Sequence, residues 1–93
     1  MELYGFITYL KEEKKSSDNT CEAYMRDIKA FGEFLQRRGI VALEKAGSND
    51  VAAYMMELKN SGKSKATINR KLSSIRTYYK FLIKKGMMKE NPT

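Results

Sequence analysis

The clearest helical pattern of the chain reads SKATINRKLSSIRTYYKFL over residues 64–82. Its large apolar side chains recur at steps of 4, 3, 4 and 3, which places them on one face of an α-helix. These side chains are Ile68, Leu72, Ile75, Tyr79 and Leu82. Ser64 can accept a hydrogen bond from a first-turn N–H, and Gly86 can close the far end. We predict a helix over residues 65–85 that is buried along this face.

Three other stretches have the same apolar spacing, and none alternates as a half-buried strand does. We predict helices over residues 2–14, 18–38 and 49–60, with Ser17 and Ser48 as N-caps and Gly39 closing the second helix. The expected buried faces carry Leu3, Phe6, Ile7 and Leu10, then Cys21, Tyr24, Ile28, Phe31 and Leu35, then Val51, Tyr54, Met55 and Leu58. Because such short helices are marginal alone, we expect an all-α four-helix bundle without a sheet.

The composition is that of one small globular domain. The 93 residues are 42% hydrophobic and 31% charged, which is too apolar for a disordered chain and sufficient for one modest core. No uncharged run is long enough to cross a bilayer, so we expect no membrane partner, and the start MELYG does not read as a secretory signal. The single cysteine, Cys21, cannot form an internal disulfide and fits a reducing cytoplasm.

The absence of histidine limits the chemistry of the chain. Without histidine, and with one cysteine, the common zinc sites cannot be assembled, and the usual general base of nucleophilic catalysis is missing. The adjacent acids Glu12 and Glu13 lie in a solvated Lys-Glu-Glu-Lys-Lys run rather than in an apolar pocket. We therefore expect no cofactor and no complete active site.

The positive charge is concentrated in the last third of the chain. Residues 1–58 hold eight basic and ten acidic residues, whereas residues 59–93 hold ten basic residues and one acid, Glu90. The net charge of +7 therefore arises from one segment. Such segregation indicates a polyanionic partner, because a merely solubilising surface, the alternative reading, usually mixes charges of both signs.

The predicted fourth helix has a second face of different chemistry. Opposite its apolar side chains we place Ala66, Arg70, Ser74 and Thr77, flanked by Thr67 and Lys71, with Lys63 and Lys65 beside the helix start. Small residues allow close approach, hydroxyls and free N–H groups bind phosphate, and arginine can bind a phosphate or a guanine edge. This combination is typical of a helix that enters the major groove of DNA, although a solvated helix face is the plainer reading.

The predicted second helix offers a weaker version of the same face. Its outer residues Thr20, Ala23, Arg26, Lys29 and Ala30 are small, hydroxylic or basic. Glu22 and Asp27 interrupt this surface, so a solvated helix face remains the alternative here too.

Three segments together resemble the core-binding domain of tyrosine recombinases and phage integrases. They are TxxxYxxDIxxFxxFL from Thr20 to Leu35, DVxxYxxxL from Asp50 to Leu58, and SxxTINRKLSSIRxYYxFL from Ser64 to Leu82. Gly39 separates the first two, and Asn91-Pro92 closes the pattern. The similarity covers nearly the whole chain, and the last segment is the most specific.

The resemblance implies an orthogonal four-helix bundle of the SAM-like type, a name that refers to topology and not to a cofactor. It implies that the domain forms half of a clamp around double-stranded DNA at a recombination half-site, with the second and fourth helices facing the major groove. By matching position, the implied DNA contacts are Thr20, Arg26 and Lys29 in the second helix and Thr67, Arg70 and Ser74 in the fourth. Asn69 and Arg76 also match the motif, either as contacts or as structural residues.

The resemblance further implies that catalysis belongs to a separate C-terminal domain. We expect residues 1–88 to form the DNA-binding domain and residues 89–93 to begin a linker, so that this chain binds DNA and does not cut it. The implied partners are DNA, the catalytic domain and other recombinase protomers, in a prokaryotic cytoplasm. Ser16 departs from the leucine frequent in the family. A protein–protein module whose basic face binds an acidic helix remains the alternative function.

Overall fold

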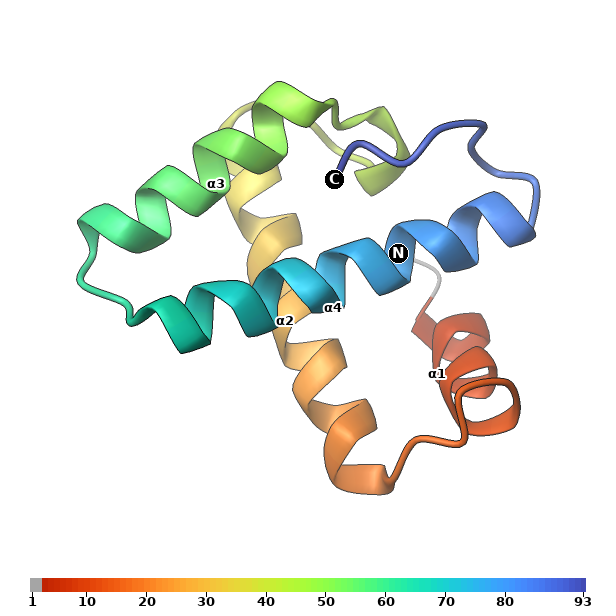
Figure 1. Cartoon of the computed structure of the whole chain (residues 1–93). Helices are drawn as coiled ribbons and strands as arrows, with labels where there is room; N and C mark the ends of the chain where they lie inside the picture. The colour runs from red at the N-terminus through yellow and green to blue at the C-terminus, as the bar shows by residue number, and fades with distance from the viewer. Residues whose placement is uncertain (1–2) are drawn as a thin grey trace.

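Four α-helices and one short 3₁₀ helix make up the computed structural model, which describes residues 3–93 (Figure 1). They are α1 (Leu3–Glu12), α2 (Asp18–Arg37), η1 (Leu43–Lys45), α3 (Ser48–Asn60) and α4 (Lys65–Lys84). No strand occurs within residues 3–93, so the predicted all-α four-helix fold is confirmed. Each described helix end lies within two residues of its predicted position, and η1 was not predicted. The predicted start at residue 2 and the side chain of Leu3 lie outside what the structure describes.

The two long helices, α2 and α4, organise the bundle, because each packs against the other and against α1 and α3. In Figure 1, α2 passes behind α4 and crosses it steeply, while α3 and α1 lie on opposite sides of α4. The N-terminal halves of α2 and α4 therefore diverge from a common crossing point. No helix in the described part of the chain is both long enough and apolar enough to span a bilayer.

The core is built largely from aromatic rings. Phe6, Phe31 and Tyr79 are fully buried, and the Phe6 ring meets the Tyr78 ring edge-on with centroids 4.9 Å apart. The predicted face of α4 is partly wrong: Ile68 and Leu72 are only partly buried, whereas Tyr78 and Phe81 are buried. Tyr24, Ile7 and Met55 are likewise only partly buried, whereas Cys21 is 4% exposed, as its place on the apolar face predicts. The physical reason is that α1 packs on the C-terminal half of α4, where the Phe6 ring contacts the rings of Tyr78 and Phe81.

Local hydrogen bonds explain where the helices begin and end. Ser17 and Ser64 cap α2 and α4 as predicted, each accepting a 3.2 Å bond from the N–H three residues later. The prediction for Ser48 is wrong, because Ser48 is already helical and the preceding Gly47 is the cap residue. The Gly47 N–H donates to the Asp50 carboxylate at 2.8 Å. Gly39 follows α2 at φ +82°, a left-handed conformation that glycine adopts without a Cβ clash.

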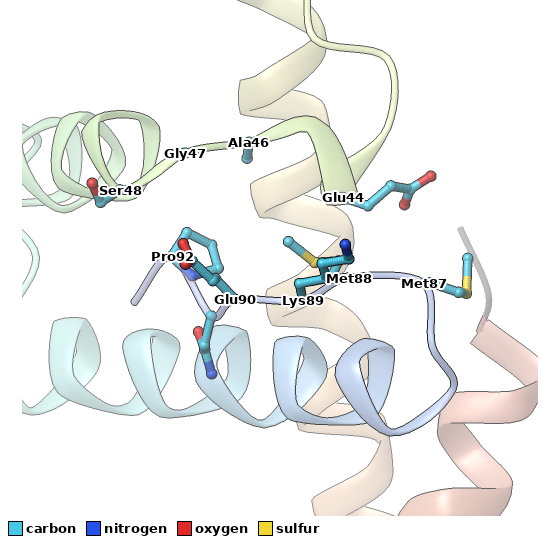
Figure 2. Close-up of a pocket in the computed structure, with 10 residues that line it drawn as sticks. Glu44, Ala46, Gly47, Ser48, Met87, Met88, Lys89, Glu90 and Pro92 are labelled. Atoms are coloured by element: carbon cyan, nitrogen blue, oxygen red, sulfur yellow. The ribbon is translucent and has the colours of Figure 1, made fainter.

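The segment after α4 folds back over the body of the domain. Figure 2 shows Met88 and Pro92 facing Ala46, Gly47 and the first residue of α3, Ser48. A hollow of about 500 Å³ lies between the two segments. Met88 packs against the core, and the Asn91 amide donates to the Arg76 carbonyl at 3.4 Å.

Two buried tyrosines predict a loss of stability in alkali. Burial first, and then the nearby charges of Asp27 and Glu57, raise the pKa of Tyr54 to about 12. Burial also raises the pKa of Tyr79, whose hydroxyl donates to the Leu43 carbonyl at 2.8 Å. Above pH of about 10 the unfolded phenols ionise while the folded ones stay neutral, so the free energy of unfolding should fall by about 1.4 kcal/mol per pH unit for each tyrosine. Urea unfolding from pH 9 to 11 measures this slope.

Tyr79→Phe supplies the control for the alkaline series. This variant removes one of the two shifted phenols, so its stability at pH 11 should decline less steeply than that of the unchanged chain. An identical slope for the two proteins would show that these tyrosines do not cause the alkaline loss.

Candidate nucleic-acid interface

A groove of about 320 Å³ lies between the N-terminal halves of α2 and α4. Its α2 wall includes Thr20, Ala23 and Tyr24, and its α4 wall includes Arg70 and Ser74. The fold therefore brings together three residues that the sequence pattern had placed on two separate helices: Thr20, Arg70 and Ser74. The groove combines small and apolar side chains with one half-exposed guanidinium, whose side chain is 50% exposed.

A buried carboxylate lies at the base of this groove, where α2 crosses α4. Asp27 has no exposed surface. Its Oδ1 accepts from Arg70 Nη2 at 2.9 Å and from Lys71 Nζ at 3.2 Å. Its Oδ2 accepts from Ser74 Oγ at 2.7 Å. Removing a carboxylate from water is costly, and these three donors, two of them charged, offset that cost.

This cluster corrects three sequence-based expectations. Asp27 does not interrupt an exposed surface of α2, because it is fully buried. Ser74 is also fully buried, so its expected place on the exposed face of α4 is wrong. Lys71 lies with its side chain 13% exposed and its ammonium on Asp27, so it is not the free surface cation that its sequence position suggested. In all three cases the reason is the α2–α4 crossing, which covers this side of both helices.

The two helices begin with the same local structure. In α2 the Ser17 hydroxyl donates to Thr20 Oγ1 at 2.9 Å, and in α4 the Ser64 hydroxyl donates to Thr67 Oγ1 at 3.1 Å. The threonines are thereby held at the helix starts, with Thr20 exposed and Thr67 partly buried. Both walls of the groove thus start from a capped N-terminus, where the helix dipole favours negative charge.

The remaining predicted cations are exposed, but they do not share one site. Lys63 and Lys65 flank the start of α4, and Arg26 lies on α2 with its side chain in solvent. Lys29 lines a different hollow of about 300 Å³, together with Glu33, Gln36 and Val41. Asn69 and Arg76 are both exposed. The geometry therefore separates Lys29 from the groove that contains Thr20 and Arg70.

The described residues show no grouping suited to metal binding. Within residues 3–93 there is no group of three or more His, Cys, Asp or Glu side chains that could hold an ion. The donors that surround Asp27 are ammonium, guanidinium and hydroxyl groups, which stabilise an anion and repel a cation.

Residues 3–86 match the family described as "Phage integrase, N-terminal SAM-like domain". The chain therefore belongs to the family of N-terminal SAM-like domains of phage integrases, as the resemblance predicted. The three motif segments from Thr20 to Leu82 all fall within the matched residues.

The chain is also similar to curated tyrosine recombinases. The chain is 40% identical over 87 residues to the tyrosine recombinase XerC of Anoxybacillus flavithermus. It is 37% identical over 87 residues to the tyrosine recombinases XerC of Listeria innocua and of Bacillus subtilis. In each case the match covers 94% of this chain and 29% of the relative, so the chain spans less than a third of these proteins. No solved structure gives a significant match.

Proposed function

We propose that this chain is the DNA-binding core-binding domain of a site-specific tyrosine recombinase, which binds duplex DNA through α2 and α4. The observation that carries this proposal is the groove between the two helices, where Thr20 and Arg70 face a common space beside two capped helix starts. The acid-free stretch from Lys59 to Lys89 supplies a matching positive field. In this proposal the catalytic domain lies outside the chain, and the domain binds without cleaving.

The residues proposed to contact DNA are predicted site residues whose side chains keep exposed surface in the structure. They are Thr20 and Arg26 on α2, and Lys63, Lys65, Thr67 and Arg70 at the start of α4. The lysines are suited to phosphates, and Arg70 is suited to a phosphate or a base edge, because a guanidinium can donate two parallel hydrogen bonds. Ser74 and Lys71 do not belong to this set, because both bind Asp27. Lys29 is exposed on α2 and stays a proposed contact outside the groove.

A salt titration with matched variants tests the proposal. We expect the unchanged domain to bind a generic duplex with Kd roughly micromolar or weaker at physiological salt, with log affinity falling linearly with log salt. Lys63→Ala/Lys65→Ala should weaken binding and reduce the slope by about 0.9 for each phosphate that is no longer neutralised. Fluorescence anisotropy with a labelled duplex measures both quantities.

The control variant removes the same charge elsewhere. Lys45 is the last residue of η1, and Lys89 lies on the returning C-terminal segment; both are exposed, and neither lines the groove. Lys45→Ala/Lys89→Ala should therefore change the slope far less. Equal effects of the two double variants would mean that only net charge matters. Binding to an acidic helical peptide with no salt-dependent binding to duplex would instead favour a protein–protein module.

A further inference from the structure

We infer that Asp27 is a positioning residue for DNA binding, which acts by orienting the Arg70 guanidinium toward the groove between α2 and α4. This inference rests on the proposed function and deepens it. A buried acid within a DNA-binding surface is unexpected on charge alone, since it repels phosphate. The contacts of Asp27 with Arg70, Lys71 and Ser74 give a physical reason for an acid at this position.

Arg70 is anchored at one nitrogen and open to the groove at the others. One nitrogen of the Arg70 guanidinium, Nη2, donates to Asp27 Oδ1 at 2.9 Å, yet half of the Arg70 side chain stays exposed. A guanidinium carries five N–H donors in a fixed plane. Anchoring one nitrogen to a buried acceptor therefore restricts the orientation of the guanidinium and leaves other donors for a ligand in the groove. Less side-chain entropy is then lost when DNA binds.

Asp27 is itself held by contacts with both of its carboxylate oxygens. Asp27 is fully buried, and Ser74 Oγ holds its second oxygen at 2.7 Å. Ser74 lies one helical turn after Arg70, and its hydroxyl is also 3.2 Å from the Arg70 carbonyl oxygen. Lys71 occupies the remaining position on Oδ1 at 3.2 Å. Asp27 thus separates the neighbouring Arg70 and Lys71 charges, which would repel each other without it.

A positioning role and a purely electrostatic role of Asp27 predict opposite changes in DNA affinity when its charge is removed. Asp27→Asn removes one negative charge while keeping nearly the same shape and an oxygen that can accept from Arg70. If Asp27 mattered only through its charge, this variant would bind DNA more tightly. If Asp27 positions Arg70, the weaker anchor loosens the guanidinium and binding should become at least about fivefold weaker, the lower end of what one good arginine contact contributes.

The experiment measures duplex affinity at fixed salt for the unchanged chain, Asp27→Asn, Arg70→Ala and the double variant. The expected result is a loss for Asp27→Asn in the unchanged background and no further loss in the Arg70→Ala background. Tyr79→Phe serves as a destabilised control, because it loses the bond to the Leu43 carbonyl far from the groove and should bind normally. Circular dichroism at the assay temperature verifies that each variant is folded.

Tighter or unchanged binding by folded Asp27→Asn would overturn the inference while leaving DNA binding intact. An equal loss in both backgrounds would overturn it as well. Absence of duplex binding by the unchanged chain would instead overturn the proposed function. Should Asp27→Asn unfold, NMR of the unchanged chain decides: resolved guanidinium N–H signals of Arg70 before DNA is added support positioning, and fully averaged signals contradict it.

Discussion

Replacing Phe31 with alanine should lower the free energy of unfolding by about 3–5 kcal/mol, which is most of the stability of many small domains. Phe31 is fully buried, and its ring centroid lies 5.2 Å from that of Tyr54 on α3 and 6.4 Å from that of Tyr79 on α4. One side chain of α2 therefore ties together three helices. Truncation leaves a cavity that rigid aromatic neighbours cannot easily fill, so the lost transfer free energy and the cavity both destabilise the fold.

Chemical denaturation with Met56→Ala as control measures this effect. Met56 is a large apolar residue that is 57% exposed, so its truncation should change stability by no more than about 0.5 kcal/mol. Leu72→Ala should fall between the two, because Leu72 is only partly buried. Identical denaturation midpoints for Phe31→Ala and Met56→Ala would contradict the packing of α2 described above.

Replacing Arg70 with alanine should weaken duplex binding by about 1–3 kcal/mol if the guanidinium reads a base edge. Lys85→Ala removes the same charge from the other end of the helix, where Lys85 Nζ lies 5.7 Å from the centre of the Phe81 ring. Charges beyond about 8–10 Å are largely screened at physiological salt, so this control should cost much less. Equal losses of affinity for the two variants would mean that α4 contributes only positive charge, with no specific contact at Arg70.

Arg70→Ala has a second consequence that Lys85→Ala lacks. It removes one of the two charged partners of a buried carboxylate, so Asp27 keeps only Lys71 and Ser74. The variant should therefore also be less stable than the unchanged chain. Binding is best compared at a temperature where both variants are fully folded by circular dichroism. A change in sequence preference would identify a base contact, whereas an even loss across sequences would identify a phosphate contact.

Apolar spacing was sufficient to predict the helices but not the exact face of each helix that is buried. The steps between Ile28, Phe31 and Leu35 determine the buried side of α2. Toward the start of α4 the same method chose Ile68 and Leu72, which are only partly buried. A single-helix pattern cannot include which neighbours cover which turn. That information depends on how α2 and α4 cross.

The wrong predictions of exposure at the candidate site share one physical cause. Asp27 lies three residues after Tyr24 and four before Phe31, so its spacing already puts it beside the apolar face. Its charge argued against burial, because carboxylates are rarely buried unless they are paired. The partners of Asp27 are Arg70, Lys71 and Ser74, more than forty residues away in the sequence. Thr20 and Arg70, by contrast, were predicted as site residues, and they meet in one groove.

The only thiol of the chain lies in the first turn of α2, where Cys21 is 4% exposed. A labelling reagent must reach the sulfur from solvent, so we expect Cys21 to react mainly in molecules in which its cover has opened. The same turn contains Thr20 and forms one wall of the groove. The domain therefore contains its own chemical reporter: the rate of thiol labelling should follow local opening at the first turn of α2, which carries part of the groove wall.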